Sequence, residues 1–163
     1  MMTEATLNIE FSDELERIDF ARVTALLADE YWCTGIQQGE VVCGAQNSTL
    51  VVGAYLEGEL VGYLRVVSDR TRFAYIADVV VDERYQKQGI GQGMVRYAME
   101  HERLKLVFQW LLTTSTAHGV YEKVGFKALE RPENWMIHHK GRPAPEEYIR
   151  RSAVAREMLE DLE

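Results

Sequence analysis

The spacing of hydrophobic residues changes along the chain, and these changes predict where strands and helices lie. Residues 7–11 alternate between apolar and polar side chains, which is typical of a short strand. Asp19 precedes apolar positions spaced by three and four residues over 20–27, the pattern of a helix with Asp19 as its N-cap. After an interruption at residues 31–35, a second short helix is predicted over 39–46.

Three runs rich in β-branched and aromatic residues follow, and together they predict a meander of antiparallel strands. The runs cover residues 49–56, 60–67 and 73–81, and turn residues such as Glu57-Gly58 separate them. The valines at 79–81 are too apolar for a half-exposed strand. We therefore expect the third strand to be buried.

The character of the chain changes after this meander. A polar, glycine-rich stretch leads into a helix that starts near Ile90. The nearly continuous apolar run over 105–112 is interpreted as a buried strand. A short helix is then expected up to Lys123, with Ser115 or Thr116 as its cap.

Two closing strands, over 126–129 and 135–138, are predicted to complete one domain that spans residues 1–140. Residues 141–163 form a separate C-terminal extension in which a helix covers 146–162. Its sparse apolar stripe suits packing on the domain or on a second copy of the chain, and the sequence does not separate these options.

Composition limits the classes of function that the chain can have. Its 163 residues are 47% hydrophobic, which is sufficient for the core of a single domain. The formal net charge of -8 disfavours binding to nucleic acid through phosphate neutralisation. An acidic surface suits a cationic acceptor such as an amine, although it also serves solubility alone.

Cysteines and apolar runs bear on metal binding and location. Cys33 and Cys43 are the two cysteines, no zinc-ligand spacing surrounds them, and the histidines form no cluster, so no metal site is expected. A lone cysteine such as Cys33 is usually a small buried hydrophobe, and we assign it no nucleophilic role. The acidic N-terminus does not resemble a signal peptide, and no run approaches the roughly 20 apolar residues of a membrane span. These features predict a cytoplasmic protein that has no membrane partner.

The central motif follows the third predicted strand directly and reads Gln86-x-x-Gly89-x-Gly91 at the start of a helix. Glycines let the backbone turn sharply and approach a ligand closely. The first N–H groups of a helix are unpaired and lie at the positive end of its dipole, which suits a pyrophosphate. No Gly-Lys-Ser/Thr follows, so the motif is not a P-loop, and an antiparallel meander is not the dinucleotide-binding βαβ unit.

A second motif, Tyr121-Glu122-Lys123-Val124-Gly125-Phe126, lies at a fitting distance after the first. With both motifs, roughly residues 15–140 resemble the GNAT superfamily of N-acetyltransferases. The chain is most similar to a bacterial subgroup with no assigned substrate, which shares Tyr31-Trp32, the 73–81 strand and the segment 117–121. The resemblance implies an α+β fold, with a mixed α/β sheet that is central, mostly antiparallel, twisted and flanked by helices.

The resemblance also implies a site for acetyl-CoA. In such enzymes the coenzyme A pyrophosphate rests on amides of the glycine-rich turn, here Lys87 through Gln92. The pantetheine arm pairs with the preceding strand, here at Val79 and Val81, while the strand after the turn splays away and opens a cleft. The cofactor-binding residues expected from the resemblance are Val79, Val80, Val81, Gln86, Lys87, Gln88, Gly89, Ile90, Gly91, Gln92 and Thr114.

The resemblance also implies catalytic roles for single residues, which we assign position by position. Tyr121 occupies the family's tyrosine position and is expected to act as general acid toward the departing thiolate. Gln109 stands where many relatives carry a glutamate base, so the base is not carried over. Asp78 is one candidate base, by proximity to the acetyl site. His118 is another, or it orients Tyr121 from three residues away.

Tyr31 and Trp32 lie where such proteins wall the acceptor pocket, which favours an amine with an apolar body. The leading interpretation is transfer of acetyl from acetyl-CoA to the primary amine of a small molecule, by direct attack in a ternary complex. Acetylation of a protein or peptide amine, and a non-catalytic sensor of acyl-CoA, stay open as alternatives. Because GNAT proteins often dimerise, a monomer or a homodimer is expected.

Overall fold

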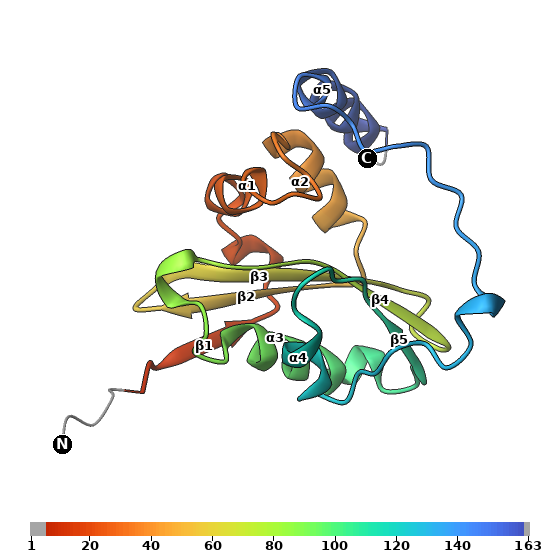
Figure 1. Ribbon diagram of the computed structural model, residues 1–163. Coiled ribbons are helices and arrows are strands. Elements are labelled where there is room, and N and C mark those ends of the chain that lie inside the picture. The colour runs from red at the N-terminus through yellow and green to blue at the C-terminus, as the bar shows by residue number, and fades with distance from the viewer. Residues whose placement is uncertain (1–5, 162–163) are drawn as a thin grey trace.

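The computed structural model describes residues 6–161, and a five-stranded sheet in the order β1-β2-β3-β4-β5 forms its centre (Figure 1). The first four strands are mutually antiparallel, and β5 lies parallel to β4. The strands are β1 (Ile9–Ser12), β2 (Leu50–Leu56), β3 (Glu59–Ser68), β4 (Phe73–Val81) and β5 (Gln109–Leu111). The mixed sheet, mostly antiparallel, and the meander of β2 to β4 are confirmed.

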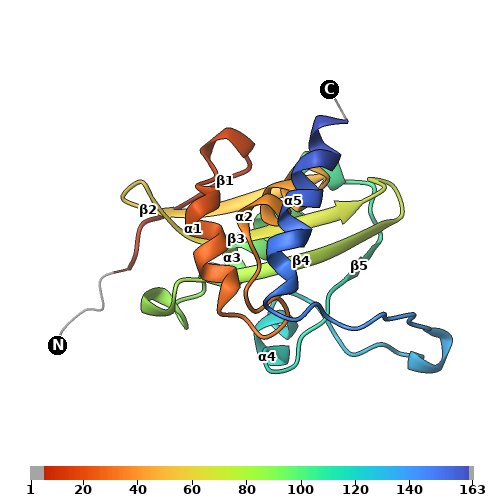
Figure 2. The same cartoon turned by 90° about the horizontal axis from the view of Figure 1, so that it is seen from above.

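Helices cover both faces of this sheet. Figures 1 and 2 show α1 and α2 on one face, α5 lying over α2, and α3 and α4 on the other face. The helices are α1 (Phe20–Ala28), α2 (Gln38–Gln46), α3 (Ile90–Met99), α4 (His118–Glu122) and α5 (Glu147–Glu160). Short 3₁₀ helices cover Leu15–Arg17, Glu83–Tyr85, Glu102–Leu104 and Pro132–Asn134. Within the described residues, no helix has the length and apolarity that crossing a membrane requires.

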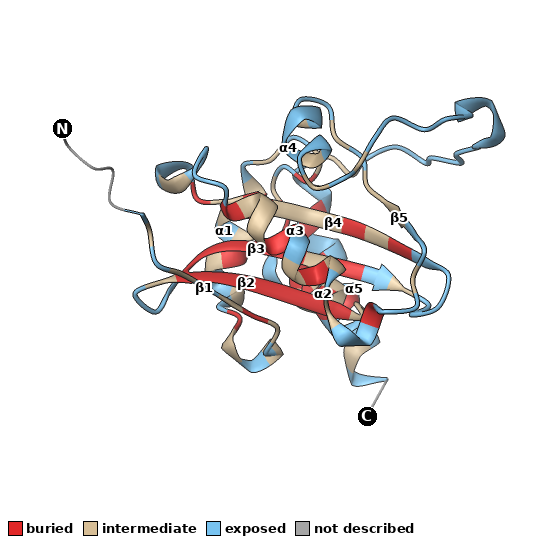
Figure 3. Ribbon diagram, turned by 90° about the horizontal axis from the view of Figure 1, so that it is seen from below, coloured by how far each residue is buried: buried red, intermediate tan, exposed pale blue. Residues whose placement is uncertain are grey.

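Strand β3 is buried on both faces because each face packs against helices. Tyr63 belongs to the core shared with α1 and α2, while its neighbour Leu64 belongs to the core shared with α3, and both side chains are fully buried. Alternate residues of a strand point to opposite faces, so a strand between two cores is apolar throughout. Figure 3 shows buried residues concentrated in β2 and β3, whereas α4 and the segment after it are largely exposed.

The predicted helix starts are confirmed in part. The carboxylate of Asp19 accepts a hydrogen bond from the Arg22 N–H at 3.0 Å and caps α1 as expected. The cap predicted for α4 is wrong, because neither Ser115 nor Thr116 holds its first turn. Thr114 Oγ1 instead accepts from the Ala117 N–H at 3.0 Å.

The second half of the sheet is shorter than predicted. The run 105–112 was expected to be a buried strand, but β5 covers three residues and lies at the edge of the sheet. Leu106 and Phe108 are 64% and 73% exposed. The continuous apolar run therefore did not indicate burial, because β5 has a neighbouring strand on one side alone within the described residues.

The two closing strands are also absent from the described part of the chain. Residues 126–131 and 135–146 are irregular, and this segment runs outside the body of the molecule before α5 returns (Figure 1). Met136 and Ile137 are 98% and 84% exposed. Strand propensity reflects packing on a half-buried surface, and the side chains of Met136 and Ile137 are exposed instead.

The C-terminal helix packs on the chain's own α2. Tyr148, Ser152 and Ala155 are buried between the two helices, and the Gly39 N–H donates to Ser152 Oγ at 2.9 Å. Glu40 accepts three hydrogen bonds from the Arg151 guanidinium at the border of this contact, at 3.2, 2.9 and 2.5 Å. Of the two options that the sequence left open, the structure therefore shows packing on the domain. Leu162, at the end of the predicted helix, lies outside the described residues.

The close contact between α2 and α5 generates a stability prediction. A Cβ at Gly39 would overlap both the Ser152 hydroxyl and its carbonyl oxygen. We expect Gly39→Ala to destabilise the protein by about 1–2 kcal/mol, because the overlap outweighs the helix propensity of alanine. Urea unfolding measures the change. Gly119→Ala in α4 is the matched control, since a Cβ there meets nothing within 4 Å, and it should be neutral or stabilising. Equal stabilities for the two variants would contradict the packing of α5 on α2.

Candidate active site

The candidate site begins where β4 loses its neighbour β5. The two strands pair over three positions, from Phe73 with Gln109 to Tyr75 with Leu111. From Ile76 to Val81, β4 continues without a strand on that side in the part of the chain that the structure describes. Its backbone groups on this open edge are therefore available to another extended molecule.

The backbone direction at the end of β4 follows from two hydrogen bonds. The Asp82 N–H donates to the Val61 carbonyl of β3 at 2.8 Å. Backbone groups of successive residues in a strand point to opposite sides, so Val80 also faces β3, whereas Val79 and Val81 face the open edge. In agreement, the Val81 carbonyl accepts from Gln86 Nε2 at 3.1 Å on that side. Of the three valines predicted to bind the cofactor, Val79 and Val81 thus offer backbone groups to the edge.

A β-bulge interrupts β4 at Asp78 and Val79. Tyr63 pairs with Val80 and Arg65 pairs with Ala77, so Asp78 and Val79 together oppose the single residue Leu64. Asp78 has φ +57°, a left-handed conformation that is uncommon for residues other than glycine. A bulge bends the strand and turns its side chains and backbone groups in new directions.

The predicted glycine-rich turn joins β4 to α3. Lys87 and Gly89 have φ of +62° and +79°, and Gly89 is the N-cap of α3 without a side-chain cap. A Cβ added at Gly89 would meet nothing within 4 Å, so the space above the turn is open. The first N–H groups of α3, at Ile90, Gly91 and Gln92, thus form a helix N-terminus that no side chain caps. This geometry fits an anionic group such as a pyrophosphate.

Asp82 fixes the start of the turn. Its carboxylate accepts from the Arg84 N–H at 2.9 Å and from the Arg84 guanidinium at 2.8 Å, and it is paired with Arg22 of α1. These hydrogen bonds, those from Arg84 first, lower the pKa of Asp82 to about 2. The carboxylate is therefore charged and fully occupied at neutral pH, and it ties α1 to the end of β4. Beside it, between α1 and β4, lies a cavity of about 560 Å³ to which Val80, Val81 and Gln86 contribute.

Asp78, a candidate base, is held by two partners. Its carboxylate accepts from Arg65 Nε of β3 at 2.7 Å and from Trp32 Nε1 at 3.3 Å. A carboxylate has about four acceptor positions on its two oxygens, so two partners leave further positions open. The structure thus brings Trp32, predicted to line the acceptor pocket, against a candidate catalytic residue.

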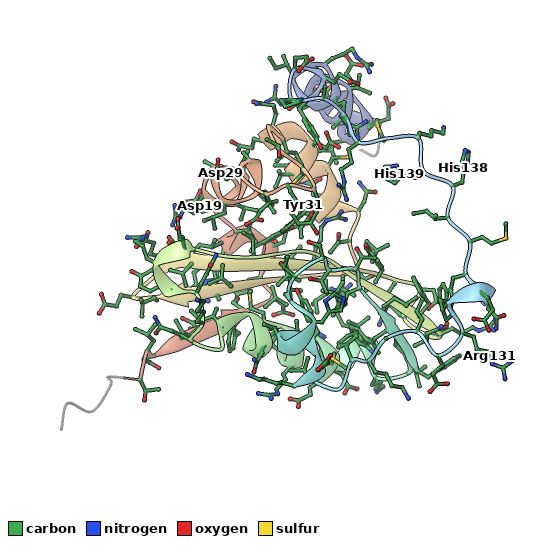
Figure 4. The ribbon with its side chains drawn as sticks, viewed as in Figure 1. Asp19, Asp29, Tyr31, Arg131, His138 and His139 are labelled. Atoms are coloured by element: carbon green, nitrogen blue, oxygen red, sulfur yellow. The ribbon has the colours of Figure 1, made fainter. Side chains whose placement is uncertain are left out.

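Tyr31 and Tyr121 lie close to each other. Burial, and then the neighbouring Tyr31, raise the pKa of Tyr121, which keeps its hydroxyl protonated at neutral pH. Tyr31 packs edge-on against Trp32 with ring centroids 5.1 Å apart, and its hydroxyl accepts from Ser115 Oγ at 2.9 Å. Figure 4 shows Tyr31 in the space between the sheet and the helices α1 and α2.

Three of the histidines are exposed, whereas Cys33 and Cys43 line a cavity between α2, α5 and the sheet. His118 is the exposed first residue of α4, and its side chain has no hydrogen bond within residues 6–161. His138 and His139 lie on the extended segment that leads to α5 (Figure 4). Burial raises the pKa of the Cys33 thiol to about 12, so it is not a thiolate at neutral pH. In the part of the chain that the structure describes, no three His, Cys, Asp or Glu side chains are grouped to hold a metal ion.

A cavity of about 580 Å³ opens beside the bulge, between α2, α5 and the sheet. Trp32 and Asp78 line it at the sheet, and α5 contributes Arg150, Val154 and Met158. The sequence predicted Trp32 here but missed Arg65, Glu40 and the residues of α5. Their contacts join segments far apart in the chain, and no local motif marks them. Tyr31 does not line this cavity, because it faces Ser115 instead.

The comparisons with known proteins agree with this geometry. The model of the acetyltransferase (GNAT) family matches residues 8–126. A protein of Xanthomonas campestris pv. campestris whose crystal structure is assigned to that family has a TM-score of 0.76 and 27% identity, over 86% of this chain and 96% of that one. Glucosamine-6-phosphate N-acetyltransferase from Arabidopsis thaliana shares the fold, with a TM-score of 0.61 and 17% identity over 82% of this chain and 99% of that one.

A curated relative matches a shorter stretch. GCN5-related N-acetyltransferase 6, chloroplastic, from Arabidopsis thaliana is 38% identical over 63 residues. The match covers 36% of this chain and 22% of that protein. The names of these proteins and the family model support acyl-CoA-dependent N-acetyltransferase activity, as the two sequence motifs predicted.

Proposed function

The chain belongs to the acetyltransferase (GNAT) family, and on this premise we propose that it transfers acetyl from acetyl-CoA to the primary amine of a small molecule. The observation that carries the proposal is the open edge of β4, which runs from the bulge to an uncapped glycine-rich turn and borders a cavity. This arrangement offers an extended site for a long anionic molecule and a separate pocket for an acceptor.

The residues present fit acetyl-CoA. The N–H groups of Ile90, Gly91 and Gln92 would hold its pyrophosphate, and the open space at Gly89 lets the anion approach. Val79 and Val81 would pair with the pantetheine arm. When bound, acetyl-CoA supplies an acyl thioester that is activated toward amines. Lys87 to Gln92 and Thr114 keep their predicted roles as cofactor-binding residues, of which Thr114 also holds the turn into α4.

The chain's own residues account for the proton movements. We propose that Asp78 receives the ammonium group of the acceptor on its free acceptor positions and takes the proton that must leave before attack. One outward N–H group, at Val79 or Val81, is the donor available to a developing oxyanion, while the other pairs with the pantetheine arm. Tyr121 donates its hydroxyl proton toward the departing sulfur, and the second proton that the acceptor nitrogen loses after attack restores the hydroxyl. His118 is exposed and takes no step in this scheme.

A small acceptor is favoured by the shape of the second cavity. Its volume of about 580 Å³ lies in the range of small-molecule sites, and residues of α5 form one of its walls. Direct attack in a ternary complex follows from the same arrangement, because the cavity and the open edge of β4 meet at Asp78. The buried Cys33 thiol, whose pKa burial raises to about 12, is protonated at neutral pH, and we assign it no step.

Replacing Gly89 in the proposed cofactor site should weaken the binding of acetyl-CoA. Gly89→Ala places a Cβ on a left-handed residue, at a cost of about 1–2 kcal/mol, and distorts the turn that holds the pyrophosphate. We expect the acetyl-CoA Kd to rise by about 10-fold in calorimetry. The matched control is Gly58→Ala, because Gly58 also has a left-handed φ and an open surrounding but lies in the β2–β3 turn. An equal effect of both variants on Kd would contradict the assigned site.

The proposed acid predicts an effect on turnover. Tyr121→Phe removes the hydroxyl proton and keeps the ring, so kcat for thiol release should fall by about 100-fold while the acetyl-CoA Kd stays unchanged. Tyr97→Phe is the control, since Tyr97 is a half-buried tyrosine whose hydroxyl donates to Asp13, on β1's side of α3. A kcat for Tyr121→Phe equal to that of Tyr97→Phe would reject the acid role.

A further inference from the structure

The charge of the acceptor cavity differs from that of the whole protein. The chain carries a net charge of -8, yet this cavity is lined by Arg65, Arg150 and Arg151 against Glu40 and Asp78. We propose that the acceptor bears a carboxylate in addition to its amine, and that Arg150 binds this carboxylate. The proposal rests on the proposed acetyl transfer and names the substrate class of that site.

The two carboxylates of the cavity already have guanidinium partners. Asp78 is paired with Arg65 at 2.7 Å, and Glu40 is paired with Arg151 through hydrogen bonds of 2.9 and 2.5 Å. All four side chains are partly shielded from solvent, with side-chain exposures between 19% and 43%. Their charges therefore compensate each other within the cavity wall.

Arg150, an exposed residue of α5, is left without a carboxylate partner in the described part of the chain. Within residues 6–161 its guanidinium has no hydrogen bond or ion pair, although it lines the cavity. Arg150, Val154 and Met158 are spaced by four residues and so form one stripe along α5. The stripe presents a cation beside two apolar side chains, while Trp32 and Val41 add apolar surface on the other walls.

This combination defines the chemistry of the ligand. An apolar body fits between Trp32 and the stripe of α5, and the amine of the acceptor is drawn to the free acceptor positions of Asp78. A guanidinium binds a carboxylate through two parallel hydrogen bonds. A phosphate monoester carries about two negative charges at neutral pH, and a single uncompensated guanidinium does not balance it. The cavity thus favours a monoanionic amino acid over an amino phosphate or a plain amine.

The experiment compares acceptors that differ in the carboxylate alone. Acetyl-CoA-dependent thiol release is measured with phenylalanine against phenethylamine, leucine against isoamylamine, and lysine against cadaverine. In any pair of which at least one member is acetylated, we expect the wild-type kcat/KM to be at least 10-fold higher for the amino acid than for the plain amine. Arg150→Gln should abolish this preference by lowering kcat/KM for the amino acid alone, and Arg150→Lys should restore part of it.

The matched control is Arg156→Gln, because Arg156 lies on the same helix and does not line the cavity. This variant should keep the preference of the wild type. Equal kcat/KM values within every pair, or a preference that survives in Arg150→Gln, would overturn the inference and leave the acetyl transfer standing. Thiol release with none of these amines, from protein that binds acetyl-CoA in calorimetry, would overturn the proposed function together with the inference.

Discussion

The parting of β5 from β4 after Tyr75 is the constraint on which the whole candidate site depends. Buried backbone N–H and C=O groups require partners, and a strand inside a sheet normally finds them on both sides. β4 is packed by helices and by β3, but within the described residues no strand pairs with one of its edges over its last six residues. That edge is a site where an extended ligand completes the hydrogen bonding that the fold leaves open.

The bulge at Asp78 lies between two parts of the candidate site, the open edge of β4 and the cavity under α5. In an undisturbed register Arg65 would lie directly opposite Asp78, but the extra residue moves its pairing to Ala77. The side chains still meet through a hydrogen bond of 2.7 Å, so the ion pair holds the bulge to β3. On one side of the bulge the open edge leads to the glycine-rich turn. On the other side, Asp78 lines the cavity under α5.

The fold could be predicted from the sequence where local patterns and motifs act. The Asp19 cap, the meander of β2 to β4 and the turn before α3 each follow from residues that are adjacent in the chain. The length of β5 and the irregular segments after α4 could not be predicted, because both depend on whether a core is available to cover apolar side chains. Leu106, Met136 and Ile137 match a strand pattern but remain exposed.

Some residues of the candidate site could likewise be predicted from the sequence, and others could not. Its motif residues, Gly89 and Tyr121, were predicted because the family constrains their spacing. The Arg65 partner of Asp78 and the charges of the acceptor cavity were missed, because Arg65, Glu40 and Arg150 are brought together by tertiary packing. The acidic chain suggested a plain cationic acceptor, whereas the cavity is locally cationic.

Amide hydrogen exchange with and without acetyl-CoA tests the central claim most directly, because it reads the backbone groups of the open edge one by one. Acetyl-CoA should slow exchange at Val79 and Val81 and in the turn from Lys87 to Gln92, since these amides gain partners on binding. Amides of the β2–β3 hairpin should not change. Binding of acetyl-CoA that leaves exchange at Val79, Val81 and the turn unaltered would contradict the account.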